Sequence, residues 1–240
     1  PEAPHRHVTG YWTLEDDSWT PPRQLKAFLE APDPRPVVSV GFGSMPTSDP
    51  HQLTALLRQA AATAGVRVVL LSGWSEHTAP DQHDPNMIVL NAAPHDWLYP
   101  RVAAAVHHGG AGTTAASLRA GIPTVVVPFA VDQPFWGQRV HALGAGPQPL
   151  PHHQLTPARL AHRLRAATTD STMREAAEHL GHLIRAEDGI AAAISGLSAA
   201  ALGYTAHFCV AGVVCTATLV FVLRVRGGDP MQRGAAQEAP

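Results

Sequence analysis

The chain has 240 residues, a formal net charge of −2, 45% hydrophobic residues and 15% charged residues. This length suits one ordinary domain with an appendage or two small domains, and the apolar content is too high for a largely disordered protein. The near-neutral charge gives no electrostatic reason to expect a nucleic-acid partner. Cys209 and Cys215 lie in one apolar stretch without a histidine cluster, which argues against a disulfide framework and a zinc site.

The first 35 residues are rich in Pro, Asp and Trp, and we expect a linker and lead-in with one short helix over 21–31. From residue 36 onward, apolar strand patterns alternate with helical patterns. The predicted strands are 37–41, 66–71, 87–90, 102–106 and 124–128. The predicted helices are 51–64, 95–101, 113–121 and 133–144, and the segments from 156 to about 197 are also expected to be helical. Short apolar strands separated by helices are typical of an α/β domain with a doubly wound parallel sheet, here over residues 36–197.

The domain pattern fades near residue 197, and residues 199–223 contain no Asp, Glu, Lys or Arg. This length is sufficient to cross a bilayer as a helix, and Arg224 and Arg226 form a basic flank. The stretch is also rich in Ala, Gly and Thr, so a helix buried against another partner, or a tail from a gene fusion, is an alternative. We expect an apolar, candidate transmembrane helix over 198–226 and a disordered tail over 227–240.

The stretch HHGGAGTT, residues 107–114, follows a predicted strand and opens a predicted helix. Gly109, Gly110 and Gly112 permit positive φ and leave the backbone of the turn bare. The amides at a helix start have no internal partner, and with the helix dipole they favour a phosphate. The alternatives are a tight turn without further purpose and a cradle for a diphosphate, which His108 and Thr113 would also contact.

Three kinds of phosphate site differ in their sequence signatures. A Walker loop requires a lysine, and the nearby sequence has none. A dinucleotide site fits Gly110, Gly112 and Ala115 as G-x-G-x-x-A, with Asp132 twenty residues after Gly112. Asp132 lies beyond Pro128 in a loop, however, whereas the acid of such a site belongs at a strand end. The third candidate is a sugar-nucleotide site.

The segment HHGGAGTTAASLRAGIPTVVVPFAVDQPFWGQRV, residues 107–140, resembles the donor-binding motif of family 1 glycosyltransferases of the GT-B fold. The bacterial natural-product and sterol glucosyltransferase types are the most similar. TGYW (9–12) resembles their interdomain linker, VVSVGFGSM (37–45) the first strand of their C-terminal domain, and PHDWLYPR (94–101) their segment beside the nucleotide base. The resemblance covers residues 8–197 and implies the Rossmann-like C-terminal half of a GT-B fold.

The resemblance also implies roles for individual residues. The residues expected to bind the diphosphate are Ser44, His108, Gly110, Gly112, Thr113 and Thr114. Asp132 and Gln133 are expected to bind the donor sugar, although Asp132 is alternatively a helix cap. The residues expected near the base are Ala93, His95, Trp97 and Trp74, with a core position as the alternative for Trp97. His107 is expected to be structural.

The activity that the resemblance implies is inverting, metal-independent transfer of a hexose from UDP or dTDP to a hydroxyl of a lipophilic acceptor. No cofactor and no metal ligand are expected, and the catalytic base is expected in an N-terminal acceptor domain outside this chain. The chain alone should therefore bind the donor but transfer sugar poorly or not at all. The alternatives are a non-catalytic nucleotide-sugar-binding or membrane-tethered remnant and an NAD-type dehydrogenase domain.

The amino-acid composition and the apolar tail predict a cellular location. Lys26 is the only lysine, whereas arginine, alanine and proline are abundant, which indicates a GC-rich genome that we interpret as bacterial. We therefore expect a bacterial cytoplasmic protein, attached to the inner membrane if residues 199–223 form a spanning helix.

Overall fold

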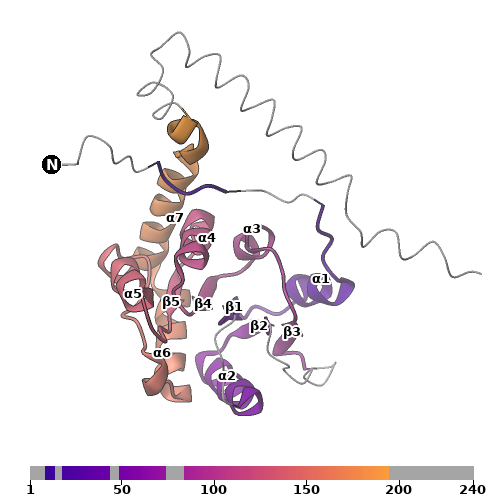
Figure 1. Ribbon diagram of the computed structural model, residues 1–240. Coiled ribbons are helices and arrows are strands. Elements are labelled where there is room, and N and C mark those ends of the chain that lie inside the picture. Colours follow the sequence, from indigo (N-terminus) through magenta and orange to yellow (C-terminus); the bar gives the residue numbers. More distant parts are fainter. Residues whose placement is uncertain (1–8, 14–17, 44–48, 74–83, 195–240) are drawn as a thin grey trace, which may run out of the picture. The chain divides into compact units, whose positions relative to one another are not determined.

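The computed structural model describes residues 9–13, 18–43, 49–73 and 84–194 (Figure 1). The chain divides into two units, residues 13–187 and residues 1–12 together with 188–240. In the second unit, the indole of Trp12 donates to Thr9 Oγ1 at 3.2 Å, and Gly189 lies so close to the backbone of Thr9 that a Cβ would be 2.8 Å from its oxygen. The sheet lies in the first unit.

The described part of the chain forms a parallel five-stranded sheet in the order β3-β2-β1-β4-β5. The strands are β1 (Val37–Gly41), β2 (Arg67–Leu71), β3 (Met87–Leu90), β4 (Ala104–His107) and β5 (Thr124–Val126). In register, Gly41 lies opposite both Leu71 and His107. This confirms the doubly wound α/β fold. Because the chain winds outward in both directions from β1 and β4, the crevice for a ligand is expected between the carboxyl ends of these two strands.

The helices of the first unit are α1 (Arg23–Glu30), α2 (Pro50–Ala64), α3 (His95–Leu98), α4 (Ala111–Ala120), α5 (Gln133–Ala142), α6 (Pro157–Thr169) and α7 (Ser171–Ala186), with 3-10 turns at Tyr99–Arg101 and His152–Gln154. The side chains of Asp49, Thr156 and Asp170 cap α2, α6 and α7 by accepting backbone N–H groups. Gly121 ends α4 in the left-handed region, as the sequence predicts.

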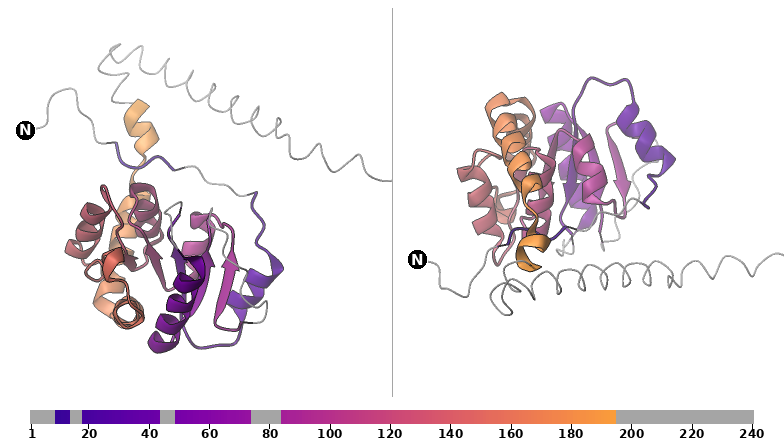
Figure 2. Two further views of the ribbon diagram at one scale, coloured as in Figure 1. Left: turned by 60° about the horizontal axis from the view of Figure 1, so that its bottom comes forward. Right: turned by 90° about the horizontal axis from the view of Figure 1, so that it is seen from above.

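Alternating residues of each strand supply the two cores on opposite faces of the sheet. Val38, Val40, Val68 and Leu70 pack with the apolar residues of α2 and α6. Residues of the other parity, such as Val69, pack with α1, α3 and α4. The views in Figure 2 show the helices in layers on either side of the strands. Burial on both faces accounts for the nearly continuous apolar character of the strands.

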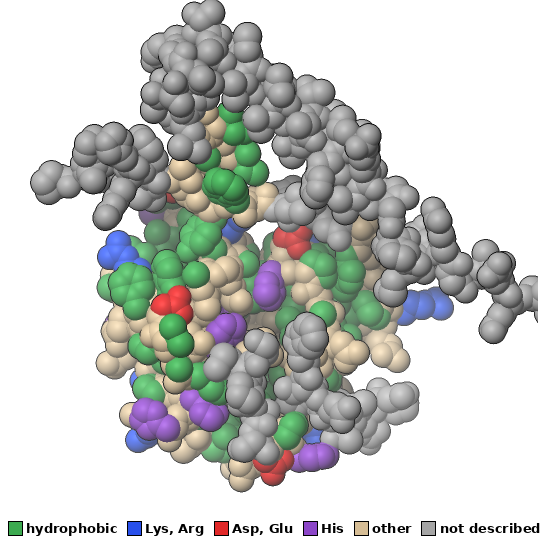
Figure 3. Space-filling view, viewed as in Figure 1, with side chains coloured by type: hydrophobic (Ala, Val, Ile, Leu, Met, Phe, Trp, Pro, Cys, Tyr) green, Lys and Arg blue, Asp and Glu red, His purple; other side chains and the backbone are tan. Residues whose placement is uncertain are grey.

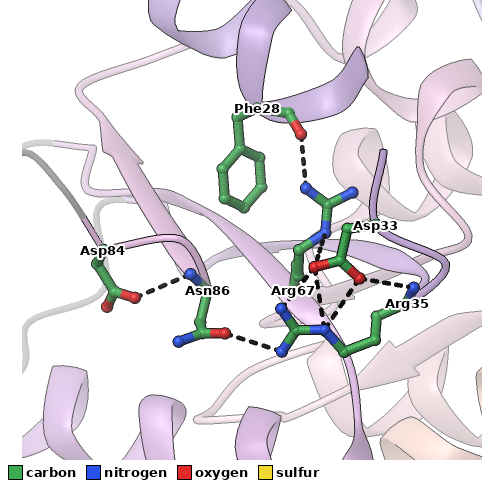
Figure 4. Close-up of polar contacts among 6 residues, drawn as sticks. All are labelled: Phe28, Asp33, Arg35, Arg67, Asp84 and Asn86. Atoms are coloured by element: carbon green, nitrogen blue, oxygen red, sulfur yellow. Dashed lines mark hydrogen bonds and ion pairs between the residues drawn. The ribbon is translucent and has the colours of Figure 1, made fainter. Parts of the chain in front are cut away.

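A polar cluster joins the lead-in to the amino ends of three strands (Figure 4). Arg67, the first residue of β2, is 3% exposed; its guanidinium donates to Phe28 O at 2.7 Å and pairs with Asp33 at 3.7 Å. Arg35 donates to Asp33 and to Asn86 Oδ1, which lies just before β3. Hydrogen bonds from Arg35 hold the pKa of Asp33 well below its usual range. The cluster thus fixes α1 and the amino ends of β1, β2 and β3 to one another.

The structure corrects several predicted boundaries. β4 begins at Ala104 rather than 102 and continues through His107, so the first histidine of HHGGAGTT belongs to the sheet. The helical segments predicted between 156 and about 197 include α6 and α7, which meet at Asp170. Within the residues that the structure describes, no helix is both long and apolar enough to cross a membrane. The predicted apolar helix over 198–226 and the tail over 227–240 lie outside the described residues.

Candidate functional site

Glycine-bearing turns meet where β1, β2 and β4 end. Gly43, with φ +62°, follows β1, and a Cβ on Gly43 would lie 3.3 Å from His108 Cε1 in the turn after β4. Gly73, which follows β2 with φ +62°, lies so near that its Cβ would be 2.6 Å from Gly43 O. Three loops separated in sequence therefore lie together at the switch point. In the space-filling view, histidine side chains are visible on the face where the end of β4 and α3 lie (Figure 3).

A buried hydrogen-bond network shapes the turn after β4. His107 Nδ1 accepts the amide of Gly109 at 3.0 Å, which leaves the ring proton on Nε2, 3.2 Å from Ser117 Oγ. Ser117 Oγ also receives the hydroxyl of Thr124 at 2.9 Å and donates to Thr114 O at 3.0 Å. Burial lowers the pKa of His107 to about 3, and the neighbouring histidines act in the same direction. His107 is thus a structural residue that holds the glycine turn against α4 and β5.

His108 is half-buried in the crevice between the glycine turns. A Cβ on Gly110 would lie 2.5 Å from its Nε2, so the ring fits only beside a bare backbone. Its Nδ1 is buried and has no hydrogen-bond partner among the described residues. Burial lowers the pKa of His108, while the Asp132 carboxylate opposes the shift. The ring therefore places beside the crevice a polar atom for which the described residues supply no partner.

The amino end of α4 lies beside this ring. The helix begins at Ala111, two residues before the predicted start, and Gly110 precedes it without a side-chain cap. The amides of Ala111, Gly112 and Thr113 come before the first intrahelical bond, which Thr114 N makes to Gly110 O at 2.9 Å. Gly112 is exposed, and a Cβ there would meet no described atom within 4 Å. Donor groups and open space thus coincide at this helix start.

The two predicted diphosphate hydroxyls of α4 differ in their surroundings. Thr113 is partly exposed in the first turn. Thr114 is 1% exposed, and its Oγ1 has no hydrogen-bond partner among the described residues. Ser44, the predicted contact from the loop after β1, lies outside the described residues, as does Trp74.

The loop after β5 brings Asp132 and Gln133 to the same crevice. A Cβ on Gly109 would lie 3.1 Å from Gln133 O, so the loop packs directly on the glycine turn. Gln133 is buried, and its Oε1 accepts the amides of Phe129 at 2.7 Å and Ala130 at 3.2 Å. Gln133 Oε1 therefore holds the loop in place. The expected contact of Gln133 with the sugar stays a prediction.

Asp132 is exposed and occupies the N-cap position of α5, but its side chain makes no capping hydrogen bond with the described residues. Its carboxylate instead accepts the indole N–H of Trp136 at 2.9 Å. The sequence offers one signal for this pairing, because residues four apart on a helix lie on the same face. Asp132 also lies six residues beyond the end of β5, unlike the acid of a dinucleotide site.

Val131, next to Asp132, has an unusual backbone. Its φ is +58°, a region that β-branched residues rarely adopt, and its side chain is 94% exposed. Packing therefore does not offset the strain. We expect Val131→Gly to raise the free energy of unfolding by about 1 kcal/mol, since relief of roughly 1–3 kcal/mol of strain exceeds the added entropy of the unfolded chain. Urea denaturation measures this difference.

The neighbouring exposed Ala130, which does not have positive φ, provides the control. Ala130→Gly should lower the stability slightly, because only the entropy of the unfolded chain changes. A Val131→Gly variant that loses as much stability as Ala130→Gly would show that the backbone at Val131 is not strained.

Three of the predicted base-proximal residues, Ala93, His95 and Trp97, lie on α3 or just before it. Ala93 is buried, and the ring of His95 stacks on Tyr99 at 4.6 Å between centroids. Burial lowers the pKa of His95 despite the nearby Asp96. Trp97 packs edge-on against Trp19 at 5.0 Å, with the Arg101 guanidinium 4.3 Å from its ring centroid. Its core contacts are those of a packing residue, and the base contact remains a prediction.

Comparison with known proteins identifies the family. Residues 55–191 match the family described as Erythromycin biosynthesis protein CIII-like, C-terminal domain. The chain belongs to this EryCIII-like family. A sterol 3-beta-glucosyltransferase of Cryptococcus neoformans var. neoformans serotype D is 39% identical over 213 residues, which cover 80% of the chain and 13% of that relative. A similar enzyme of Emericella nidulans is 42% identical over 200 residues, which cover 79% of the chain and 14% of that relative.

Solved structures agree with this assignment. The glycotransferase of kitacinnamycin has a TM-score of 0.60 and 26% identity, covering 77% of this chain and 46% of its own. The glycosyltransferase VinC, solved in complex with dTDP, has a TM-score of 0.53 and 27% identity, covering 67% of this chain and 40% of its own. The EryCIII-like chain is thus a glycosyltransferase C-terminal domain of Rossmann-like fold, and the dehydrogenase alternative is not supported.

The same comparisons show how much of each relative the chain covers and from which organisms the relatives come. The EryCIII-like chain spans only about one eighth of the length of the sterol glucosyltransferases that it matches. Those relatives are fungal, so the expected bacterial location is wrong. The abundance of arginine, alanine and proline reflects codon composition, which is not restricted to bacteria. The predicted membrane attachment has no support, since its segment lies outside the described residues.

Proposed function

We propose that this domain binds a UDP- or dTDP-hexose and that the diphosphate docks at the amino end of α4. The observation that carries the proposal is that uncapped α4 amides lie beside His108, whose Nδ1 has no hydrogen-bond partner among the described residues. Buried polar atoms normally have a partner, and a bound ligand would supply one. The helix dipole and free amides favour an anion at this position.

The same donors account for a role in sugar transfer. The acceptor oxygen attacks the anomeric carbon as the bond from that carbon to the diphosphate oxygen breaks, which inverts the anomeric centre. Negative charge then grows on the leaving diphosphate. Amides held in place by α4, together with the His108 ring, stabilise that charge more in the transition state than in the ground state.

The sugar would lie toward Asp132. Its exposed carboxylate can accept hydrogen bonds from sugar hydroxyls while the Trp136 indole orients it. Gln133 would contribute mainly by holding the loop, because its Oε1 binds two backbone amides.

The acceptor is proposed by analogy with the relatives. The curated relatives are sterol glucosyltransferases, which supports a lipophilic acceptor with a hydroxyl group. Attack requires a base that removes the hydroxyl proton. We propose that this base belongs to an acceptor-binding domain outside the chain, so that the chain alone binds donor but transfers sugar poorly or not at all.

Gly112→Ala gives the sharpest test of the diphosphate site. The added methyl meets no described protein atom, but it fills the space where the diphosphate is proposed to lie. Calorimetric titration with UDP and dTDP should show that the variant binds at least tenfold more weakly. Its melting temperature should be unchanged or slightly higher, since alanine favours a helix over glycine by about 0.5–1 kcal/mol.

His108→Ala should weaken the same binding, and His179→Ala on the exposed surface of α7 is the matched control. The proposal fails if the wild-type chain does not bind either nucleotide at millimolar concentration, or if Gly112→Ala and His108→Ala both bind as well as wild type. Stronger binding of NAD than of UDP would favour a dinucleotide site instead.

A further inference from the structure

A hollow is lined by residues of α5, of α6 and of the loop after β5. The ribbons of α5 and α6 lie near β5, the edge strand of the sheet (Figure 1). The volume of the hollow is about 640 Å³, within the range of small-molecule sites. The lining comes from the loop after β5, the first half of α5, residues 148–151 and the first turns of α6. The residues proposed to bind the diphosphate and the sugar are not part of this lining.

The polar side of this α5–α6 hollow carries positive charge without a counter-charge. Arg159, His162 and Arg163 from α6 line it, and none of its lining residues is acidic. The nitrogen Nε of Arg163 is buried and has no hydrogen-bond partner among the described residues. The Arg159 guanidinium donates to the neutral oxygens of Gln154, at 3.2 and 3.4 Å. The amino end of α6 adds the positive end of its helix dipole.

Much of the remaining lining of the α5–α6 hollow is apolar. Four prolines contribute to it, together with Leu150 and Ala158; the prolines are Pro128, Pro134, Pro149 and Pro151. The backbone of this wall is fixed by bonds from Leu150 N to Val126 O and from His152 N to Pro128 O, each 2.9–3.0 Å. Proline rings lose little conformational entropy when a ligand covers them.

We propose that the α5–α6 hollow binds an amphipathic anion, with a carboxylate or phosphate head on the arginines and an apolar body on the proline wall. Arginine is suited to both heads, because its planar donors match carboxylate and phosphate oxygens. Charge complementarity selects the anionic class, and the proline wall requires an apolar body. The site is separate from the donor crevice, so this proposal does not depend on the proposed function.

Calorimetric titration of the full chain with decanoate and decyl phosphate, both below micellar concentration, tests the site. At least one should bind, and the stronger identifies the head group. Inorganic phosphate and decanol, which supply only one half of the chemistry each, should bind at least tenfold more weakly. Saturating UDP should leave the affinity unchanged.

Arg163→Gln should weaken binding at least tenfold, whereas Arg174→Gln, on the exposed surface of α7, should leave it unchanged. If a thermal melt shows that Arg163→Gln does not fold, Arg159→Gln provides the same test from the rim. The proposal is overturned if neither amphiphile binds, if UDP competes with them, or if the folded arginine variant binds as wild type does.

Discussion

Gly109→Ala is expected to lower the free energy of unfolding by about 2–5 kcal/mol and to weaken UDP binding together with it. The residue has φ +92°, and an added Cβ would lie 2.6 Å from Val126 Cγ1. Left-handed strain contributes roughly 1–3 kcal/mol and the overpacking against β5 a similar amount. Chemical denaturation measures the stability, and calorimetry measures the affinity.

Gly112→Ala is the matched control, three residues further along the same turn. It adds the same methyl group where no described atom lies within 4 Å. The two variants should separate two roles of glycine in this turn, since Gly109 packs against β5 and Gly112 is proposed to border the ligand. Equal stability of the two variants would contradict the close packing seen at Gly109.

The protein is expected to lose stability as the pH falls below about 6.5, and His107 should carry much of that loss. Burial lowers its pKa to about 3, so between these pH values the unfolded chain binds a proton that the folded chain does not. The free energy of unfolding should therefore fall by roughly 1.4 kcal/mol per pH unit from this residue alone. His95 and His108, whose pKa values burial also lowers, act in the same direction.

His107→Gln isolates the contribution of that residue. Glutamine has an acceptor oxygen for the amide of Gly109 and a donor nitrogen for Ser117, but it does not titrate. Urea denaturation between pH 7 and pH 4 should show a shallower pH dependence than in wild type, even where the variant is less stable at pH 7. His179→Gln, on the surface of α7, should keep the wild-type slope. Identical slopes in all three proteins would show that His107 is protonated while the protein remains folded.

Much of the fold follows from local pattern. β1 and β3 have the predicted bounds because their apolar runs are buried on both faces and end at turn residues. α4 begins at Ala111, two residues before the start that the sequence predicts. Glycines at 110 and 112 have low helix propensity, so the local sequence does not indicate the first turn of this helix. Tertiary context overrides propensity at this position.

The sequence predicts which residues make up the candidate site, but not the hydrogen bonds that they form. HHGGAGTT indicates a phosphate cradle because its glycines and its position between strand and helix are local features. By contrast, the Asp132 carboxylate binds the indole of Trp136, a contact that was not predicted, and Gln133 turns its Oε1 to its own loop. Such choices between competing donors depend on three-dimensional placement, which the spacing of residues does not reveal. The α5–α6 hollow likewise joins segments that have no shared sequence motif.

The polar cluster around Arg67 has a consequence for how this architecture tolerates change. It secures one end of the strands, through Asp33, Arg35 and Asn86, and the glycine turns occupy the other end. Anchorage and recognition are therefore spatially segregated along the strand axis. Substitutions in the glycine turns therefore leave the contacts of the Arg67 cluster in place. Such a fold can acquire a different ligand preference without losing the contacts that hold the strands together.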